Sequence, residues 1–185
     1  MGLALPLATP LTVEDVWAIP SDGRRHELIE GALIVTPAPG AAHQTCLLEL
    51  AVLLRAATTP DHLVLMAPFD WVAGPQTLLQ PDVLVARRAD VAATGDKRLE
   101  RPPLLVVEVT SPSTAMVDWG TKRLAFQAAG VLTYWLVDPD DPRLIVLRVR
   151  NGVYVEEVVV RGDEQYVADD PFPVTVVPNQ LRKGL

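Results

Sequence analysis

One stretch, residues 104–138, restricts the possible folds of this chain more than any other. Residues 104–109 (LLVVEV) form a Leu- and Val-rich run that is typical of a strand covered on both faces. A Ser-Pro-Ser-Thr break follows, then a helical pattern over residues 114–129, Gly130 as a C-terminal cap, and a second apolar run at 132–137. The stretch therefore predicts a strand, a turn, a helix and a second strand at the centre of an α/β domain.

The predicted helix carries charged residues on the face that should pack against the sheet. Helical spacing places five residues on one stripe: Ala115, Asp118, Lys122, Ala125 and Ala129. The second half of this stripe is small and apolar, whereas the first half contains an Asp and a Lys. Glu108 lies beside that first half, within an apolar strand, where an ionised carboxylate is costly unless it is paired or binds a metal.

The rest of the chain alternates short strands with helices. We expect helices over residues 13–19 and 41–57, and a short helix in the polar loop 87–100. The expected strands are 26–29, 32–36, 62–66, 69–72, 83–86 and 172–177, with a hairpin of 143–150 and 153–160 around Asn151-Gly152. The sequence thus predicts a single α/β (α+β) domain over residues 1–185, with a mixed sheet, a C-terminal β-hairpin and a flexible arm at residues 1–10.

Charge and cysteine content limit the classes of function. The formal net charge of −7 argues against a broad basic surface for nucleic acid, although it leaves room for a local basic groove and suits a site for a divalent cation. A lone cysteine, Cys46, excludes an intrachain disulfide and a cysteine-based zinc site. The apolar runs are too short to span a bilayer and the N-terminus is a poor signal peptide, so we expect a cytoplasmic protein without a membrane partner.

Two carboxylates sit at the ends of predicted strands. Asp82 begins one strand and Glu108 ends another, so an antiparallel pairing would bring both to the same edge of the sheet. Converging carboxylates repel each other unless a cation lies between them, and oxygen ligands suit Mg²⁺ or Mn²⁺. Lys122 could then polarise a water or stabilise charge on a phosphate. The alternative is that Asp82 is only a turn residue and that Glu108 pairs with Lys122 or an arginine; the residue pattern leaves both readings open.

An ordered series of short motifs resembles a known family. The motifs are Pro81-Asp82, EVTSPST at 108–114, Asp118, GTKR at 120–123, AGV at 129–131, Tyr134-Trp135, VDP at 137–139, HELIEG at 26–31, His43-Gln44 and APFD at 67–70. Together they resemble the Uma2-like family of restriction-endonuclease-like proteins, within the PD-(D/E)xK nuclease superfamily. The resemblance is strong over residues 14–138 and looser over the C-terminal hairpin.

This resemblance implies a restriction-endonuclease-like core, a mixed central β-sheet flanked by helices. It implies that Asp82 and Glu108 bind the metal, with the main-chain carbonyl of Val109 as a third oxygen ligand. Thr110 stands where the superfamily has its lysine. The family supplies this lysine from the following helix, which here is Lys122, and the helical stripe places Lys122 on the sheet-facing side independently of the resemblance.

Five further residues are weaker candidates. Glu27 matches a family acid and is expected to assist at the metal, directly or through water, although it could be a solvated hairpin residue. His43 could bind a phosphate, or it could be a hydrogen-bonded histidine at a helix start. Ser111 and Ser113 are expected to cap the helix, with a second role in contacting a phosphate. Asp118 is expected to orient Lys122.

The leading hypothesis is a Mg²⁺-dependent endonuclease that hydrolyses DNA phosphodiester bonds. In this hypothesis Asp82 and Glu108 hold Mg²⁺ or Mn²⁺, Glu27 assists, and Lys122 stabilises or activates the attacking water. The net negative charge, and Thr110 in the place of the superfamily's lysine, support a second hypothesis. In this hypothesis the chain is a non-catalytic nucleic-acid- or protein-binding module on a nuclease fold. A third is a metal-dependent phosphohydrolase acting on small substrates. A homodimer is compatible with a nuclease that cuts two strands.

Overall fold

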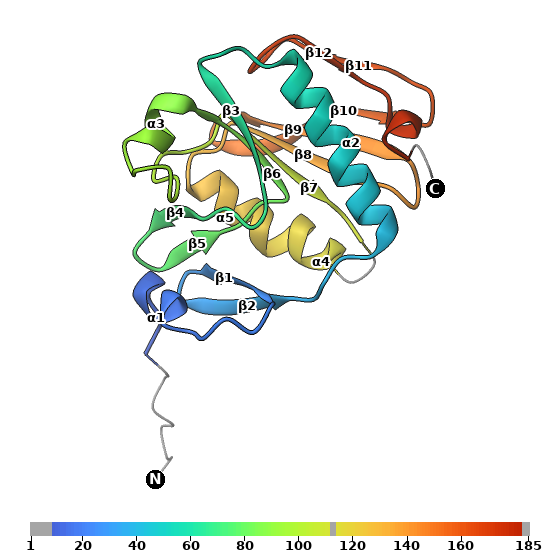
Figure 1. The fold of residues 1–185 in the computed structure, drawn as a ribbon. Helices are drawn as coiled ribbons and strands as arrows, with labels where there is room; N and C mark the ends of the chain where they lie inside the picture. The colour runs from blue at the N-terminus through green and yellow to red at the C-terminus, as the bar shows by residue number, and fades with distance from the viewer. Residues whose placement is uncertain (1–8, 112–113, 183–185) are drawn as a thin grey trace.

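A six-stranded mixed sheet crosses the centre of the molecule in the order β10-β9-β8-β7-β6-β3 (Figure 1). The computed structural model describes residues 9–111 and 114–182. The strands are β3 His62–Met66, β6 Val83–Arg87, β7 Leu105–Val109, β8 Thr133–Asp138, β9 Arg143–Arg150 and β10 Val153–Arg161. β7 and β8 run parallel and the other neighbouring pairs are antiparallel, which confirms the mixed central sheet and the C-terminal hairpin.

Two smaller sheets complete the β-structure. A four-stranded sheet of order β2-β1-β5-β4 contains β1 Arg25–Ile29, β2 Ala32–Thr36, β4 Trp71–Gly74 and β5 Thr77–Leu79. β11 Tyr166–Ala168 and β12 Val174–Val176 form a separate pair. The sequence did not predict β5 and β11, because three residues are too few to show alternation, and it placed β4 two residues too early.

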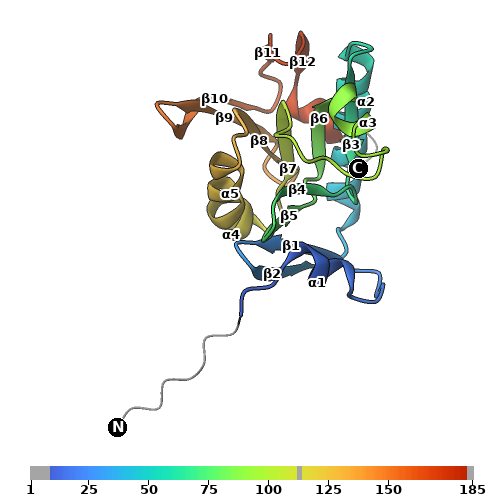
Figure 2. The ribbon, with the colours of Figure 1, turned by 90° about the vertical axis from the view of Figure 1, so that its left-hand side faces the viewer.

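Helices cover both faces of the central sheet. Helix α2, Ala41–Ala57, packs Cys46, Leu47, Leu50 and Leu54 against one face. The other face is covered by a continuous helical segment of α4 Ala115–Val117, η1 Asp118–Lys122 and α5 Arg123–Ala128. Figure 2 shows the strands between these two helical layers. The short helices α1 Val13–Trp17 and α3 Arg88–Ala92 and the 3₁₀ turn η2 Pro178–Arg182 lie at the periphery.

The helix opposite α2 contains a π-helical turn, η1, which the sequence did not predict. A π turn has i→i+5 hydrogen bonds, so it uses an extra residue and shifts the phase of the helix beyond it. The residues that this segment buries are therefore Asp118, Lys122 and Phe126. The expected small, apolar second half of the stripe is wrong, since Phe126 is fully buried whereas Ala125 is only half-buried.

Two hairpin turns follow directly from their sequences. Glu30-Gly31 joins β1 to β2 and Asn151-Gly152 joins β9 to β10, and all four residues have positive φ. This conformation matches the right-handed twist of the strands, and glycine at the second position adopts it at little cost. The turns fix the register of both hairpins.

Three further expectations concern membrane spans, the lone cysteine and the N-terminal arm. No helix among residues 9–111 and 114–182 is long and apolar enough to cross a membrane. Cys46 is a buried free cysteine. The expected arm at residues 1–10 falls mostly outside the described residues.

Candidate active site

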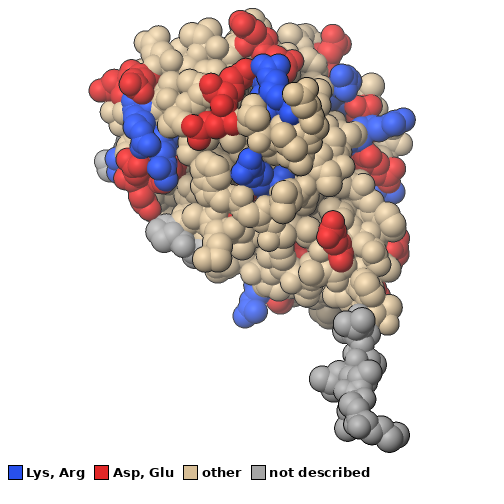
Figure 3. Space-filling view, turned by 180° about the vertical axis from the view of Figure 1, so that it is seen from behind, with Lys and Arg blue, Asp and Glu red and all other residues tan. Residues whose placement is uncertain are grey.

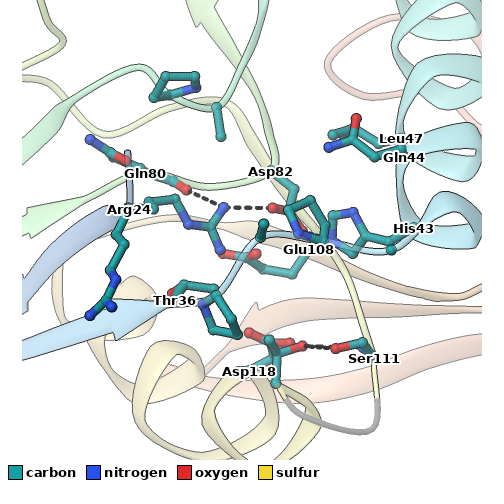
Figure 4. Close-up of a pocket in the computed structure, with 18 of the residues that line it drawn as sticks. Arg24, Thr36, His43, Gln44, Leu47, Gln80, Asp82, Glu108, Ser111 and Asp118 are labelled. Carbon is teal, nitrogen blue, oxygen red and sulfur yellow. Dashed lines mark hydrogen bonds and ion pairs between the residues drawn. The ribbon is translucent and has the colours of Figure 1, made fainter. Parts of the chain in front are cut away.

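A cavity of about 520 Å³ lies where the four-stranded sheet meets the central sheet and the first turn of α2 (Figure 4). Its walls come from the segment before β1, the loop 37–40 and Ala67-Pro68. Five of the polar lining residues are candidates singled out from the sequence: His43, Asp82, Glu108, Ser111 and Asp118. The cavity therefore gathers groups that lie far apart along the chain.

Asp82 and Glu108 meet at one edge of the central sheet, as the sequence predicted. β6 and β7 are antiparallel, and the pairing of Val83 with Val107 places Asp82 across from Glu108. Both carboxylates are almost inaccessible, at 2% and 1% exposed. The ladder thus fixes two acids side by side in a place with little water to screen them.

Lys122 joins Glu108 to Glu27. Its Nζ lies 2.9 Å from Oε1 of Glu108 and 2.9 Å from Oε2 of Glu27. The π turn of η1 holds Lys122 on the buried face of the helix, and Glu27 comes from β1. The backbone N–H of Gln80 donates to Oε1 of Glu27 at 2.8 Å, which fixes that carboxylate from the other side. Glu27 is therefore fully buried and is not the solvated hairpin residue of the alternative reading.

Asp82 is held by three donors. Arg25 Nη1 lies 2.7 Å from Oδ1, His43 Nε2 lies 3.0 Å from Oδ2, and the backbone N–H of Val109 donates to Oδ2 at 2.9 Å. His43 therefore pairs with the carboxylate from the start of α2. The role of the Val109 carbonyl as a metal ligand stays a prediction.

Arg25 is the site residue that the sequence analysis missed. It also lies 3.7 Å from Glu27 and donates to the carbonyl of Gln80 at 3.3 Å. The available signal was its i, i+2 spacing from Glu27, because alternate residues of a strand share one face. Nothing local in the sequence indicates that its partner is Asp82, which lies 57 residues away.

Burial and crowding of charge shift the proton affinities of this site. Burial raises the pKa of Glu108 well above its usual value; Lys122 opposes the shift, whereas neighbouring Asp82 and Asp118 add to it. Burial also raises the pKa of Asp118 to about 6. Burial alone would raise the pKa of Asp82, but the hydrogen bond from His43 and the charge of Arg25 outweigh it and hold that pKa well below normal.

The acids beside Lys122 also shift the pKa of its ammonium, against the effect of burial. Burial alone would lower the pKa of its ammonium, but Glu108 and Glu27 outweigh burial and raise that pKa above its usual value. Lys122 is therefore positively charged throughout the neutral range. It can stabilise negative charge but is a poor proton acceptor.

The donor set fits a hard divalent cation. The site contains four buried carboxylates but only two side-chain cations. The carboxylates are Glu27, Asp82, Glu108 and Asp118, and the cations are Arg25 and Lys122. Asp118 Oδ2 is shielded from solvent and accepts no hydrogen bond from the described residues. Within that part of the chain no three His, Cys, Asp or Glu side chains form a ligand set by themselves. Mg²⁺ suits such a site, because it binds one or two carboxylates and keeps several waters.

The remaining predicted residues have different outcomes. Ser111 lines the cavity, and its backbone N–H donates to Thr114 Oγ1 at 3.1 Å. Thr110 is buried, and its hydroxyl donates to the Val137 carbonyl at 3.3 Å. Ser113 lies outside the described residues.

Comparison with known proteins agrees with the motif series. A sequence model of the Uma2 family, described as "Putative restriction endonuclease", matches residues 13–179. The chain belongs to the Uma2 family. No curated protein matches it.

A solved structure places this Uma2 chain in a known fold. The structure is a protein of Anabaena variabilis described as "a putative nuclease", with a TM-score of 0.72 and 19% identity. The match covers 93% of this chain and 97% of the other. At this identity the match shows the fold, and it confirms the expected mixed sheet flanked by helices.

Proposed function

We propose that this Uma2 protein is a Mg²⁺-dependent endonuclease that hydrolyses DNA phosphodiester bonds, with Mn²⁺ able to replace Mg²⁺. The observation that carries the proposal is the contact of Lys122 Nζ with Glu108 and Glu27 at 2.9 Å each, beside Asp82 in the same buried cluster. Converging carboxylates can hold a cation that clamps a phosphate, and a neighbouring amine can stabilise the charge that develops there.

Each buried group has a distinct proposed role. Asp82 and Glu108 would hold the metal, with the Val109 carbonyl as a third ligand, and the bound ion would neutralise charge at the scissile phosphate. Glu27 positions Lys122, and the positive charge of Lys122 stabilises negative charge that develops on the phosphate. The carboxylate of Asp118, with a pKa near 6, is suited to accept a proton near neutral pH.

A nicking assay on negatively supercoiled plasmid, which exposes locally unpaired segments, tests the proposal. We expect nicking with Mg²⁺ or Mn²⁺ and none with a chelator. Asp82→Asn and Glu108→Gln should abolish it, because each neutral amide is a poorer metal ligand. Glu156→Gln, on the exposed side of β10, is the matched control and should keep full activity. Nicking that persists in Glu108→Gln or in chelator would reject the proposal.

A second candidate function rests on the ion pairs themselves. Glu27, Asp82 and Glu108 each already lie beside a side-chain cation, so the cluster is held together without any metal. Such a chain could be a non-catalytic nucleic-acid- or protein-binding module. This candidate predicts binding that survives Glu108→Gln, together with no metal-dependent cleavage.

The cytoplasmic location and the homodimer expected from the sequence stay predictions. Analytical ultracentrifugation of the full chain measures the second. A homodimer would sediment as one species of twice the chain mass of 20.1 kDa.

A further inference from the structure

The shape and charge of the cavity restrict which form of nucleic acid can reach the acids. We propose, on the basis of the function above, that the cavity accepts one nucleotide of an unpaired strand, as in single-stranded DNA or a frayed end, and does not accept intact duplex. Four independent features of the described residues lead to this inference.

The first feature is depth. Asp82 and Glu108 are 2% and 1% exposed and lie at the bottom of a cavity of about 520 Å³. That volume is within the range of sites that enclose one small ligand. Enzymes that act on a base held in such a pocket take single-stranded substrate or extrude the nucleotide from the duplex, and we apply the same steric limit here. We therefore expect a phosphodiester within a stacked duplex not to reach these carboxylates.

The second feature is the scarcity of free positive charge. Among the described residues that line the cavity, the cations are Arg24 and Arg25, and Arg25 is already bonded to Asp82. Elsewhere several arginines lie beside acids, as in Arg98–Glu100, Arg148–Glu157 and Arg161–Asp141. Figure 3 shows the same intermixing of basic and acidic side chains on the face opposite that of Figure 1. Duplex binding depends on many phosphate contacts, which a chain of net charge −7 with several arginines paired to acids disfavours.

The third feature is a phosphate-sized group of donors at the cavity wall. The first turn of α2 lines the cavity, and its N-cap, Gly40, makes no side-chain cap hydrogen bond. An uncapped helix N-terminus presents free N–H groups and a positive dipole end to an anion. Arg24, with its side chain 68% exposed, supplies a cation at the same mouth, where its Nε lies 3.8 Å from Asp22 Oδ2 in a solvent-exposed pair that a phosphate could displace. These groups suffice for one or two phosphates.

The fourth feature is an apolar wall for a sugar or base. Pro37, Pro39 and Pro68 line the cavity together with Leu47. Apolar walls with a few polar groups are typical of pockets that enclose a small organic group. An unpaired nucleotide has an exposed base face to place there, whereas the bases of a duplex are stacked.

The test compares single-stranded, frayed-end and blunt duplex DNA of the same sequence, with the full chain. Cleavage is measured in Mg²⁺, and binding of fluorescent strands by anisotropy in Ca²⁺. We expect single strands and frayed ends to be bound and cleaved at least tenfold better than blunt duplex. The slope of log affinity against log salt should be shallow, roughly −0.7 to −1.4, which corresponds to one or two phosphate contacts.

Three variants locate the phosphate contacts. Arg24→Ala should make the salt slope shallower by about 0.7, while Arg150→Ala, an exposed arginine on β9, leaves it unchanged. A Cβ added at Gly40 meets no atom within 4 Å. Gly40→Asp should therefore cap α2 and raise thermal stability, yet weaken strand binding severalfold by repulsion. Gly40→Ser caps without charge and should weaken binding less than Gly40→Asp.

The outcomes separate this inference from the proposed function. Equal cleavage of blunt duplex, or a steep salt slope, would overturn the inference and leave the nuclease intact. Shallow-slope binding of single strands without any cleavage would support the inference and reject the hydrolytic function. Turnover of mononucleotide phosphoesters with no binding of any strand would overturn both.

Discussion

The ammonium of Lys122 lies 2.9 Å from Oε1 of Glu108, and both side chains are at most 2% exposed. We predict that Lys122→Met lowers the free energy of unfolding by roughly 3–5 kcal/mol, because it leaves buried Glu108 without its cation and Glu27 with only Arg25, at 3.7 Å. Urea denaturation measures the change. Lys97→Met, on an exposed loop, is the control and should be neutral.

A double variant shows whether this loss comes from the ion pair. Glu108→Gln removes the charge that Lys122 neutralises, so Lys122→Met should cost less stability in that background than in the native chain. Strict additivity of the two changes would show that the lysine acts through packing alone.

Arg25 occupies the Asp82 oxygen that a metal would need. Its Nη1 lies 2.7 Å from Oδ1, and the other oxygen already accepts from His43 and Val109. We predict that Arg25→Met destabilises the metal-free protein but binds Mg²⁺ more tightly, because the competing cation is gone. Calorimetric titration with Mg²⁺ measures this affinity. The neighbouring, exposed Arg24→Met should not change it, and weaker Mg²⁺ binding in Arg25→Met would contradict the prediction.

Asp118 should make the metal-free protein less stable as pH rises. Its folded-state pKa is raised by burial from 3.8 to about 6, so between these values the native state binds more protons than the unfolded state. Stability therefore falls as pH rises through this window. We predict that Asp118→Asn gains roughly 1–3 kcal/mol at pH 7 and nothing near pH 4. Denaturation curves across this range measure the difference.

The same variant bears on the proposed proton acceptor. If Asp118 accepts a proton during hydrolysis, Asp118→Asn should lose cleavage activity while it gains stability. Full activity in this more stable variant would remove Asp118 from the mechanism without affecting the stability prediction.

Cys46 should be inert in the native protein. It is fully buried on α2, and burial, with Asp82 and Asp138 nearby, raises the pKa of its thiol to about 12. Because the thiolate is the reactive form, we predict no reaction with a thiol reagent at pH 8 in buffer and complete reaction in urea. Rapid native labelling would show that α2 opens readily from the sheet.

The elements that the sequence predicts well are those fixed by local chemistry. The 17-residue helix α2 and the hairpin at Asn151-Gly152 have the predicted bounds to within a residue, because apolar spacing and turn residues determine them. Asp82 and Glu108 were likewise predictable, since each stands at the end of a clear strand. Their meeting still depended on the antiparallel pairing of β6 and β7, which the sequence left open.

The parts that were missed depend on contacts between distant segments. Arg25 reaches Asp82 because the β1–β2 hairpin docks through the short strand β5, and neither the docking nor β5 leaves a pattern in the sequence. The burial of Phe126 in place of Ala125 depends on one π turn, which residue propensities do not encode. Contacts of the Phe126 ring with Trp71 and Tyr134 stabilise its buried position.

The π turn makes two half-helices of different phase from one continuous segment. The first half presents Asp118 and Lys122 to the buried acids, and the second anchors Phe126 among aromatic rings. Loss of a single residue between 118 and 122 would restore regular winding and rotate one half away from its partners. We therefore expect a change of length at this point to disrupt one set of contacts, whereas substitutions at the exposed Met116 or Leu124 should leave both sets in place.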